Sequence, residues 1–348
     1  MSIKVTDADS SFTGKLPKGC KLCIKGKKSV LFVTGVCHVN CYYCPVSNEK
    51  KDKDVSYINE RRVEKNTDVL EEIKACSSKG ISFTGGDPLL KINRCLEYAK
   101  LIKEEDNKHH IHLYTGSTDK TANKLEILEG YVDEVRFHVQ NEKEIEGLKN
   151  ILKMNFNFGI EIPSIPGDYK RMLTIIESAA SSKFSFINLN EFEYTETNWN
   201  ILSEKGFDFD SDTSMVKGSR ELSMNLLEEC EDLPISIHFC PSVLKDAIQL
   251  RRRWERRAKN TKKYYEEIED CLIVKGEISG DTKEIINYLR NELNISKKMY
   301  EVQEDKVYTH WAIAEEISED KKISKKVKAA IVKEYPIYKR LVVEYIPL

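Results

Sequence analysis

Three cysteines stand close together near the start of the chain: Cys37, Cys41 and Cys44. They follow an apolar run at residues 30–33 that is typical of a buried strand. A closed structural zinc site usually takes four protein ligands, whereas an iron–sulfur cluster held by three thiolates keeps one iron open to another molecule. The three thiols therefore predict a metal site, either a reactive cluster or, as an alternative, a non-catalytic iron–sulfur or zinc module.

A pair of glycines marks a second candidate site. Gly85 and Gly86 end the apolar run at residues 81–84 and are followed by Asp87 and Pro88. Because glycine has no Cβ, its backbone can approach a ligand closely. A carboxylate beside it can accept hydrogen bonds from an ammonium group. The turn is therefore a candidate site for the amine of a small ligand.

These two motifs together resemble the signature of the radical S-adenosylmethionine (radical SAM) superfamily. The cysteine spacing C-x3-C-x2-C, the aromatic Tyr43 before the last cysteine and the Gly-Gly-acid-Pro turn all match it. Asp87 is one methylene shorter than the glutamate that is commoner in the family. The resemblance covers residues 29–240 and is similar in detail to an archaeal group related to pyruvate formate-lyase activating enzyme, a group without a settled substrate.

The resemblance implies an activity and its cofactors. It implies a [4Fe-4S] cluster on Cys37, Cys41 and Cys44, with the amine and carboxylate of S-adenosylmethionine on the open iron. One electron, from a donor such as ferredoxin or flavodoxin, would then give a 5′-deoxyadenosyl radical that abstracts hydrogen from an unidentified substrate. By the same resemblance, Tyr43 and, on the fourth strand, His138 and Gln140 are candidates for cofactor binding. Asn190 is a further candidate, because it closes the sixth strand and the apolar residues around it supply the core positions, which leaves Asn190 for the interior of the barrel.

Composition limits the class of protein. Of 348 residues, 40% are apolar and 32% are charged, which indicates a globular domain. No run reaches the roughly 18 apolar residues of a membrane-spanning helix, and we expect no membrane partner. The formal net charge of -2 excludes a uniformly basic surface. With 10 Cys and no apolar segment at the N-terminus, we expect reduced thiols and a cytoplasmic location.

Short apolar runs alternate with amphipathic stretches, which predicts consecutive βα units and a parallel sheet. Six or seven units match an open, partial (βα)6-type TIM barrel, whose binding loops follow the carboxyl ends of the strands. We expect an N-terminal segment at 1–28, the barrel at 29–240, a basic helix at 241–270 and a small domain at 271–348. The expected strands cover residues 30–34, 81–84, 111–115, 132–139, 158–162, 184–189 and 235–239.

Three further cysteines are candidates for an auxiliary iron–sulfur cluster, which many superfamily members carry. Cys20 and Cys23 form a C-x2-C pair, and Cys240 ends the last expected strand. Cys271, His238 or a substrate could supply a fourth ligand. Simple barrel geometry argues against the site. Cys23 precedes a strand while Cys240 follows one, so in a parallel barrel the two residues start at opposite ends.

The C-terminal third offers two hints about the substrate. A helix expected at 244–263 carries a basic cluster that suits phosphate and base contacts. The cluster consists of Arg251, Arg252, Arg253, Arg256, Arg257 and Lys259. Beyond it, strand 272–278, helix 282–293, strands 299–302 and 307–311, helix 312–333 and strand 341–345 predict a ferredoxin-like α+β domain, with Asp281 as a helix cap. The substrate hypotheses are an RNA such as tRNA, a protein, and a small molecule.

Overall fold

The computed structural model describes residues 2–118 and 120–348. It divides into two compact units, one containing the residues up to Lys74 and Ser78–Leu250, the other containing Ala75–Ser77 and Arg251–Leu348. No helix in the described part of the chain combines the length and apolar character needed to cross a membrane. The boundaries that we expected at residues 28, 240 and 270 stay predictions.

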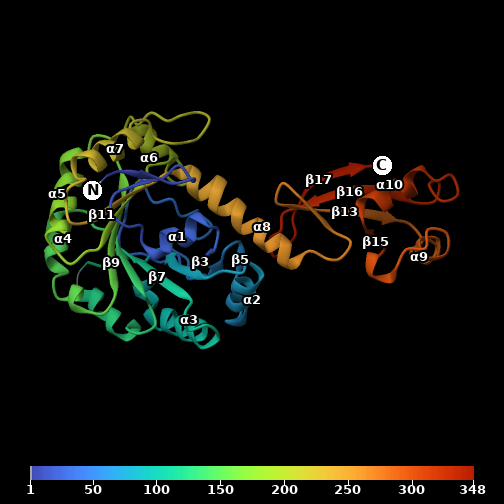
Figure 1. The fold of residues 1–348 in the computed structure, drawn as a ribbon, viewed down its shortest axis with the longest axis horizontal. Coiled ribbons are helices and arrows are strands. Elements are labelled where there is room, and N and C mark those ends of the chain that lie inside the picture. The colour runs from blue at the N-terminus through green and yellow to red at the C-terminus, as the bar shows by residue number, and fades with distance from the viewer. Residues whose placement is uncertain (1, 119) are drawn as a thin grey trace. The chain divides into compact units, whose positions relative to one another are not determined.

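The first unit is built on one open sheet in which seven strands run parallel in chain order. Each expected strand is present (Figure 1). The parallel strands are β3 (Lys28–Thr34), β6 (Gly80–Gly85), β7 (His110–Thr115), β8 (Glu134–Phe137), β9 (Asn157–Ser164), β10 (Phe186–Glu191) and β11 (Ser236–Cys240). The α/β class predicted from the alternating pattern is therefore confirmed.

Two short antiparallel pairs, which the sequence did not predict, extend the sheet at its edges. β4 (Tyr57–Ile58) and β5 (Arg61–Arg62) continue it beyond β3. β2 (Ser11–Phe12) and β1 (Lys4–Val5) continue it beyond β11. Runs of two residues are too short for the alternation of apolar and polar side chains to reveal them.

Alternation along the strands separates an apolar outer face from a polar inner face. On β7, Ile111 and Leu113 are fully buried in the main hydrophobic core, while His110, His112 and Tyr114 belong to the opposite face. Cys95, Tyr98, Ala99 and Ile102 of α3 pack in the same core. Figure 1 shows α3, α4, α5 and α7 around the outside of the sheet.

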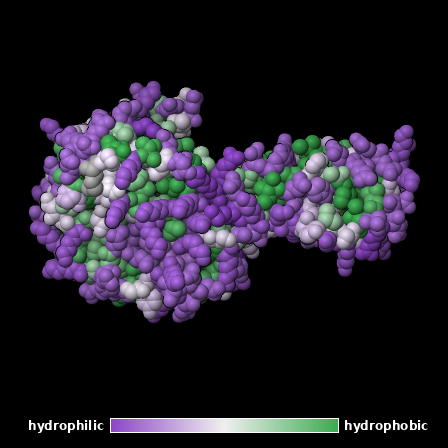
Figure 2. All heavy atoms as spheres, viewed as in Figure 1, coloured by the Kyte–Doolittle hydropathy of each residue, from purple (hydrophilic) through white to green (hydrophobic). Residues whose placement is uncertain are grey.

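The helices of the first unit connect the strands in turn, and one precedes them. α1 (Lys18–Ile24) contacts β3, β6 and β7 and lies within the curve of the sheet (Figure 1). The others are α2 (Thr67–Ala75), α3 (Ile92–Glu105), α4 (Glu142–Gly147), α5 (Tyr169–Ala180), α6 (Trp199–Glu204), α7 (Ser219–Glu229) and the π-helical turn η4 (Leu244–Gln249), with short 3-10 turns η1 (Pro88–Lys91), η2 (Lys120–Leu128) and η3 (Ile151–Lys153). Hydrophilic side chains cover most of the face of this unit seen in Figure 2.

The second unit begins with the basic helix and contains an antiparallel sheet with strand order β14-β15-β13-β16-β17, to which β12 adds by pairing with β13. Two helices accompany the sheet, and Asp281 caps the first by accepting from the backbone N–H groups of Lys283 and Glu284, as expected. The elements are α8 (Leu250–Thr261), β12 (Glu267–Glu269), β13 (Leu272–Ser279), α9 (Thr282–Asn291), η5 (Lys297–Met299), β14 (Tyr300–Gln303), β15 (Lys306–Thr309), α10 (Trp311–Glu319), β16 (Lys328–Glu334) and β17 (Val342–Pro347).

One secondary-structure prediction in this unit is wrong. The helix expected over 312–333 ends at Glu319, and its last third is the strand β16. Lysine and alanine favour a helix locally, but seven residue pairs with β13 outweigh that preference. The expected strand 341–345 exists as β17, an edge strand beside β16.

Candidate functional site

A cavity of about 690 Å³ opens where the parallel strands of the first unit end. The cysteine loop, the glycine turn and inward residues of all seven parallel strands contribute to its wall. A pocket of this volume suits a ligand of cofactor size. Of the predicted site residues, it brings together Cys37, Cys41, Cys44, Tyr43, Gly85, Gly86, His138, Asn190, Cys20, Cys23 and Cys240.

The three cysteines of the loop line this cavity as free thiols, each partly exposed. The backbone N–H of Val39 lies 3.4 Å from Sγ of Cys37, and Sγ of Cys41 lies 3.8 Å from Nε2 of His138. Burial raises the pKa of the Cys37 and Cys41 thiols, and the charge of Cys44 acts in the same direction on both. Thiols that oppose one another's ionisation in this way fit a cationic metal centre, which stabilises the thiolate form.

The glycine turn packs against the beginning of the cysteine loop. The N–H of Gly86 donates to the carbonyl of Thr34 at 2.7 Å, and that of Asp87 donates to the carbonyl of Val36 at 2.8 Å. A Cβ at Gly86 would fall well inside the van der Waals distance of the Val36 carbonyl oxygen. Gly85 has a φ of +131°, which side chains other than hydrogen rarely allow. The two glycines are therefore required by the close approach of two backbones beside the cavity.

Asp87 lies behind this turn, and its side chain does not line the cavity. The carboxylate is fully buried and accepts hydrogen bonds from the hydroxyl of Thr115 at 2.9 and 3.1 Å, from the hydroxyl of Ser117 at 2.8 Å and from the N–H of Leu89 at 3.0 Å. His38 Nδ1 lies 3.5 Å away. In this structure the Asp87 carboxylate joins the turn to the end of β7, and its role in cofactor binding stays a prediction.

Tyr43, His138 and Gln140 form a hydrogen-bonded group. Nδ1 of His138 lies 3.1 Å from the carbonyl oxygen of Glu161, so this nitrogen carries the proton. Nε2 then accepts from the Tyr43 hydroxyl at 2.7 Å and from the Gln140 amide at 2.8 Å. Burial lowers the pKa of His138, which keeps the ring neutral. Gln140 does not itself line the cavity.

A buried ionic network forms the floor of the cavity. Nη1 of Arg136 donates to Glu161 at 2.7 Å and to the hydroxyl of Tyr114 at 3.1 Å, while its Nε donates to Glu134 at 2.7 Å. Asn188 and Asn190 donate to the two oxygens of Glu161 at 2.8 and 3.0 Å. Burial alone would raise the pKa of Glu161, but Arg136 and the two amides outweigh it and lower that pKa.

Asn190 presents an unused acceptor to the cavity. Its Nδ2 donates to Glu161, whereas its buried Oδ1 has no hydrogen-bond partner among the described residues. A ligand amine or hydroxyl could therefore donate to it. Sequence reasoning identified Asn190 from its place on the sixth strand but missed Glu134 and the ionic link of Arg136 to Glu161. The alternation of polar residues along β8 was the available signal.

The additional cysteines come together in the same cavity. Cys20 and Cys23 lie on α1, whose position inside the sheet removes our objection that they start at the opposite end from Cys240. Burial raises the pKa of Cys20 to about 11, although the Arg136 guanidinium, 3.5 Å from its sulfur, acts in the other direction. His238 also lines the cavity, whereas Cys271 belongs to the second unit, where it contacts Glu255.

The basic cluster of α8 is largely engaged in structural contacts. Arg253 and Arg257 are only 4% and 5% exposed, and Arg257 donates to the carbonyl of Pro336 at 2.9 Å. Arg251 pairs with Asp270 at 3.1 Å. Part of the cluster is therefore buried or neutralised, while Arg251 and Lys259 remain exposed.

Comparison with known proteins gives one relative along nearly the whole chain. It is the "Putative glycyl-radical enzyme activating enzyme MJ0021" of Methanocaldococcus jannaschii, 39% identical over 351 residues, which are 96% of this chain and 93% of the relative. A family model described as a 4Fe-4S single cluster domain matches residues 24–156. A domain of unknown function (DUF8061) matches residues 271–348.

Two solved structures show a distant likeness. Streptococcus suis SuiB bound to S-adenosylmethionine is 12% identical, with a TM-score of 0.44, over 62% of this chain and 50% of that one. The radical S-adenosylmethionine methyltransferase TsrM from Kitasatospora setae is 13% identical, with a TM-score of 0.35, over 57% and 43%. This chain spans half or less of each, and we draw no argument from scores of this size.

The three-cysteine loop and the family match define the class of protein: a radical SAM enzyme with a [4Fe-4S] cluster and S-adenosylmethionine as cofactors. More narrowly, the chain belongs to the family of the Methanocaldococcus jannaschii protein named above. The superfamily predicted from the two motifs is therefore confirmed.

Proposed function

We propose that this enzyme is an activase that removes a hydrogen atom from a partner protein. The observation that carries the proposal is the relationship along 96% of the chain to a protein named as a glycyl-radical enzyme activating enzyme. The cavity supports it, because about 690 Å³ accommodates a cofactor and one segment of a substrate but no folded domain. The partner would therefore present a loop or an extended segment.

The residues take the following roles in this proposal. Cys37, Cys41 and Cys44 hold the cluster, which when bound supplies the electron that cleaves S-adenosylmethionine. Gly85 and Gly86 give the methionine end of the cofactor access to backbone groups, and Asp87 keeps that turn in place. Tyr43, His138 and Asn190 complete the wall of its binding site, and Gln140 holds His138 in place through its side-chain amide.

A second cluster on Cys20, Cys23 and Cys240 is part of the proposal. All three thiols line the cavity, and His238 beside them has a buried Nε2 without a hydrogen-bond partner among the described residues. One cluster gives about four iron and four sulfide per chain, and two give about eight of each. Cys20→Ala with Cys23→Ala should halve the larger value; an unchanged value near four in both proteins would contradict the second cluster.

We assign the open parallel sheet to the partial barrel of the radical SAM core. The sheet has seven parallel strands, one more than the six of a (βα)6-type barrel. The order β13-α9-β14-β15-α10-β16 supports a ferredoxin-like domain extended by β17. An electron donor of the ferredoxin or flavodoxin class completes the proposed system.

An RNA substrate is not supported, because Arg253 and Arg257 are buried and Arg251 is paired with Asp270. A protein substrate, an RNA and a small molecule can be separated by one experiment. Reduced, anaerobically reconstituted enzyme with S-adenosylmethionine is added to cell extract divided by size, and 5′-deoxyadenosine is measured. We expect the macromolecular fraction to stimulate its formation, and we expect this stimulation to survive ribonuclease and to be abolished by protease.

The controls compare one cysteine that lines the cavity with one that lies outside it. Cys41→Ala removes a proposed cluster ligand, whereas Cys76→Ala changes a fully buried cysteine outside the cavity. Cys41→Ala should form no 5′-deoxyadenosine, and Cys76→Ala should retain the activity. Stimulation by the small-molecule fraction, or its loss with ribonuclease, would overturn the activase proposal.

A further inference from the structure

A buried cluster of ionisable side chains lies at the amino ends of β7 and β8. His110 and His112 are two residues apart on β7 and so share one face, and Glu134 is the register partner of His112 on β8. Their side chains are at most 3% exposed, and none of the three lines the cavity. One nitrogen or oxygen atom from each lies within 4.8 Å of the others.

Among the described residues, neither imidazole has a hydrogen-bond partner within 3.5 Å. Both ring nitrogens of His110 and both of His112 are buried without a hydrogen bond among the described residues. A neutral imidazole has one N–H donor and one acceptor, and burying either without a partner destabilises a protein. Unsatisfied groups of this kind indicate an ion or a water at the position they face.

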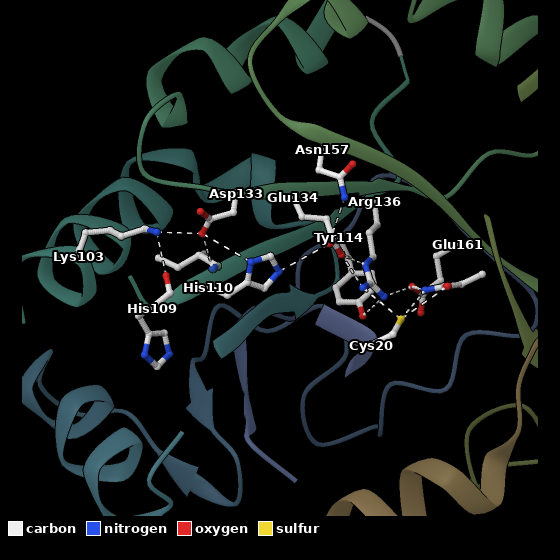
Figure 3. Close-up of polar contacts among 12 residues, drawn as sticks. Cys20, Lys103, His109, His110, Tyr114, Asp133, Glu134, Arg136, Asn157 and Glu161 are labelled. Carbon is white, nitrogen blue, oxygen red and sulfur yellow. Dashed lines mark hydrogen bonds and ion pairs between the residues drawn. The ribbon is translucent and has the colours of Figure 1, made fainter. Parts of the chain in front are cut away.

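The surroundings of the cluster are those of a metal site. Nε2 of His110 lies 3.6 Å from Oε2 of Glu134, while its Nδ1 lies 3.8 Å from Oδ2 of Asp133 (Figure 3). The other oxygen of Glu134 accepts from Arg136 at 2.7 Å. Metal-binding histidines commonly direct their second nitrogen to a carboxylate, and metal-binding carboxylates are themselves held by donors.

The charges nearby also permit a cation. Arg136 pairs with Glu161 as well as with Glu134, and Lys103 pairs with Asp133 at 2.9 Å. Asp133, Glu134 and Glu161 together balance Arg136, Lys103 and Lys28, whose charge also acts on His112, so these six side chains carry no net charge. Bonds of about 2.0–2.1 Å from a tetrahedral zinc ion would place the donor atoms roughly 3.3 Å apart, close to the 3.6 Å between His110 and Glu134.

We propose that His110, His112 and Glu134 bind one divalent transition-metal ion, and that the ion is zinc. Two imidazoles and one carboxylate are a donor set that zinc accepts, and no thiolate takes part. The ion would join β7 to β8 and, through Glu134, fix Arg136 and with it the cavity floor. Figure 3 shows this continuity from His110 through Glu134 and Arg136 to Glu161 and Cys20.

X-ray absorption at the zinc edge tests the proposal on the full, iron-loaded chain. Iron then occupies the cysteine thiolates, so zinc cannot bind to them. A second sample, in which Cys20, Cys23, Cys37, Cys41, Cys44 and Cys240 are all changed to Ser, is loaded with zinc alone. We expect about one zinc per chain in both, with nitrogen and oxygen neighbours at about 2.0 Å and no sulfur at about 2.3 Å. A sulfur shell, or zinc below about one tenth of an equivalent, would overturn the proposal.

Substitutions provide an independent test. His112→Gln and Glu134→Gln should each weaken zinc binding at least about tenfold. His109→Gln is the matched control, because His109 is also buried and its Nε2 has no partner among the described residues, but the ring points away from the cluster (Figure 3). Equal zinc affinity in all three variants would show that water satisfies the imidazoles. If a variant fails to fold, the absorption spectrum of the full chain decides.

Discussion

The hydroxyl of Tyr43 lies 2.7 Å from Nε2 of His138, a residue 95 positions further along the chain. This hydrogen bond fastens the cysteine loop to the end of β8. His138 is fixed in turn, because its Nδ1 donates to the carbonyl of Glu161 on β9. The orientation of the loop therefore depends on two neighbouring strands of the sheet.

Changing Tyr43 to Phe should loosen the loop without removing a metal ligand. The loss of one buried hydrogen bond should lower the free energy of unfolding by about 1 kcal/mol. Thermal unfolding measures this loss, and the iron content should stay unchanged. Tyr42→Phe at the adjacent position is the control, and equal melting temperatures of the two variants would contradict the prediction.

Gly86→Ala should displace the cysteine loop, because a Cβ at this position meets the backbone carbonyls of Val36 and Gly35. We expect at least a severalfold decrease in iron retained after anaerobic gel filtration. Gly147→Ala is the matched control, since within the described residues its Cβ would meet the Thr118 carbonyl oxygen at 3.4 Å, an ordinary contact distance. The same iron loss in both variants would show that close backbone approach at the turn is unimportant.

Asp87 should act on stability more than on cofactor affinity. Asp87→Ala leaves the hydroxyls of Thr115 and Ser117 and the N–H of Leu89 without their acceptor, which should cost about 2 kcal/mol or more. Asp87→Asn keeps one oxygen and should cost less. Chemical denaturation and S-adenosylmethionine titration together check this. A large loss of affinity in Asp87→Asn with unchanged stability would instead indicate direct contact with the cofactor.

Glu161 should make the stability of the first unit depend on pH. Its pKa is lowered in the folded protein, so the unfolded chain binds the proton more readily. Stability from this group is present above about pH 4.5 and is lost as the pH falls through the lower, folded-state pKa.

Replacing the Glu161 carboxylate by a neutral amide tests this pH dependence. Glu161→Gln leaves Arg136 with only Glu134 as a charged partner, and should lower the unfolding free energy by about 3 kcal/mol at pH 7. The difference from the unsubstituted chain should shrink below about pH 4.5. Glu177→Gln, on the exposed face of α5, should show no such difference. A difference in unfolding free energy that stays constant down to pH 3 would contradict a lowered pKa of Glu161 in the folded protein.

The sequence predicted the features that depend on local pattern. The cysteine spacing and the Gly85-Gly86 turn identify the superfamily because close backbone approach and metal ligation restrict which residues can stand there. The seven parallel strands followed from short apolar runs. His110 and His112 were missed, although Ile111 between them already showed that the two histidines share the inner face.

Other features depend on contacts between distant segments and could not be predicted. The sequence around Cys20 does not indicate that α1 lies inside the curve of the sheet, where this thiol and Cys240 line the same cavity. The direction of the Asp87 carboxylate is decided by Thr115 and Ser117, nearly 30 residues away. β16 was expected as a helix because its pairing with β13 is not visible in its own composition.

The pairing of β2 with β11 has a consequence for biosynthesis. Thr13 exchanges backbone and side-chain hydrogen bonds with Ile237, and the N–H of Lys15 donates to the hydroxyl of Ser236, 221 positions later. The edge of the sheet formed by β2 and β11 cannot assemble until β11, the last parallel strand, has left the ribosome. Contacts this far apart in sequence form slowly. The sheet of the first unit is therefore completed only after residues 236–240 have been translated.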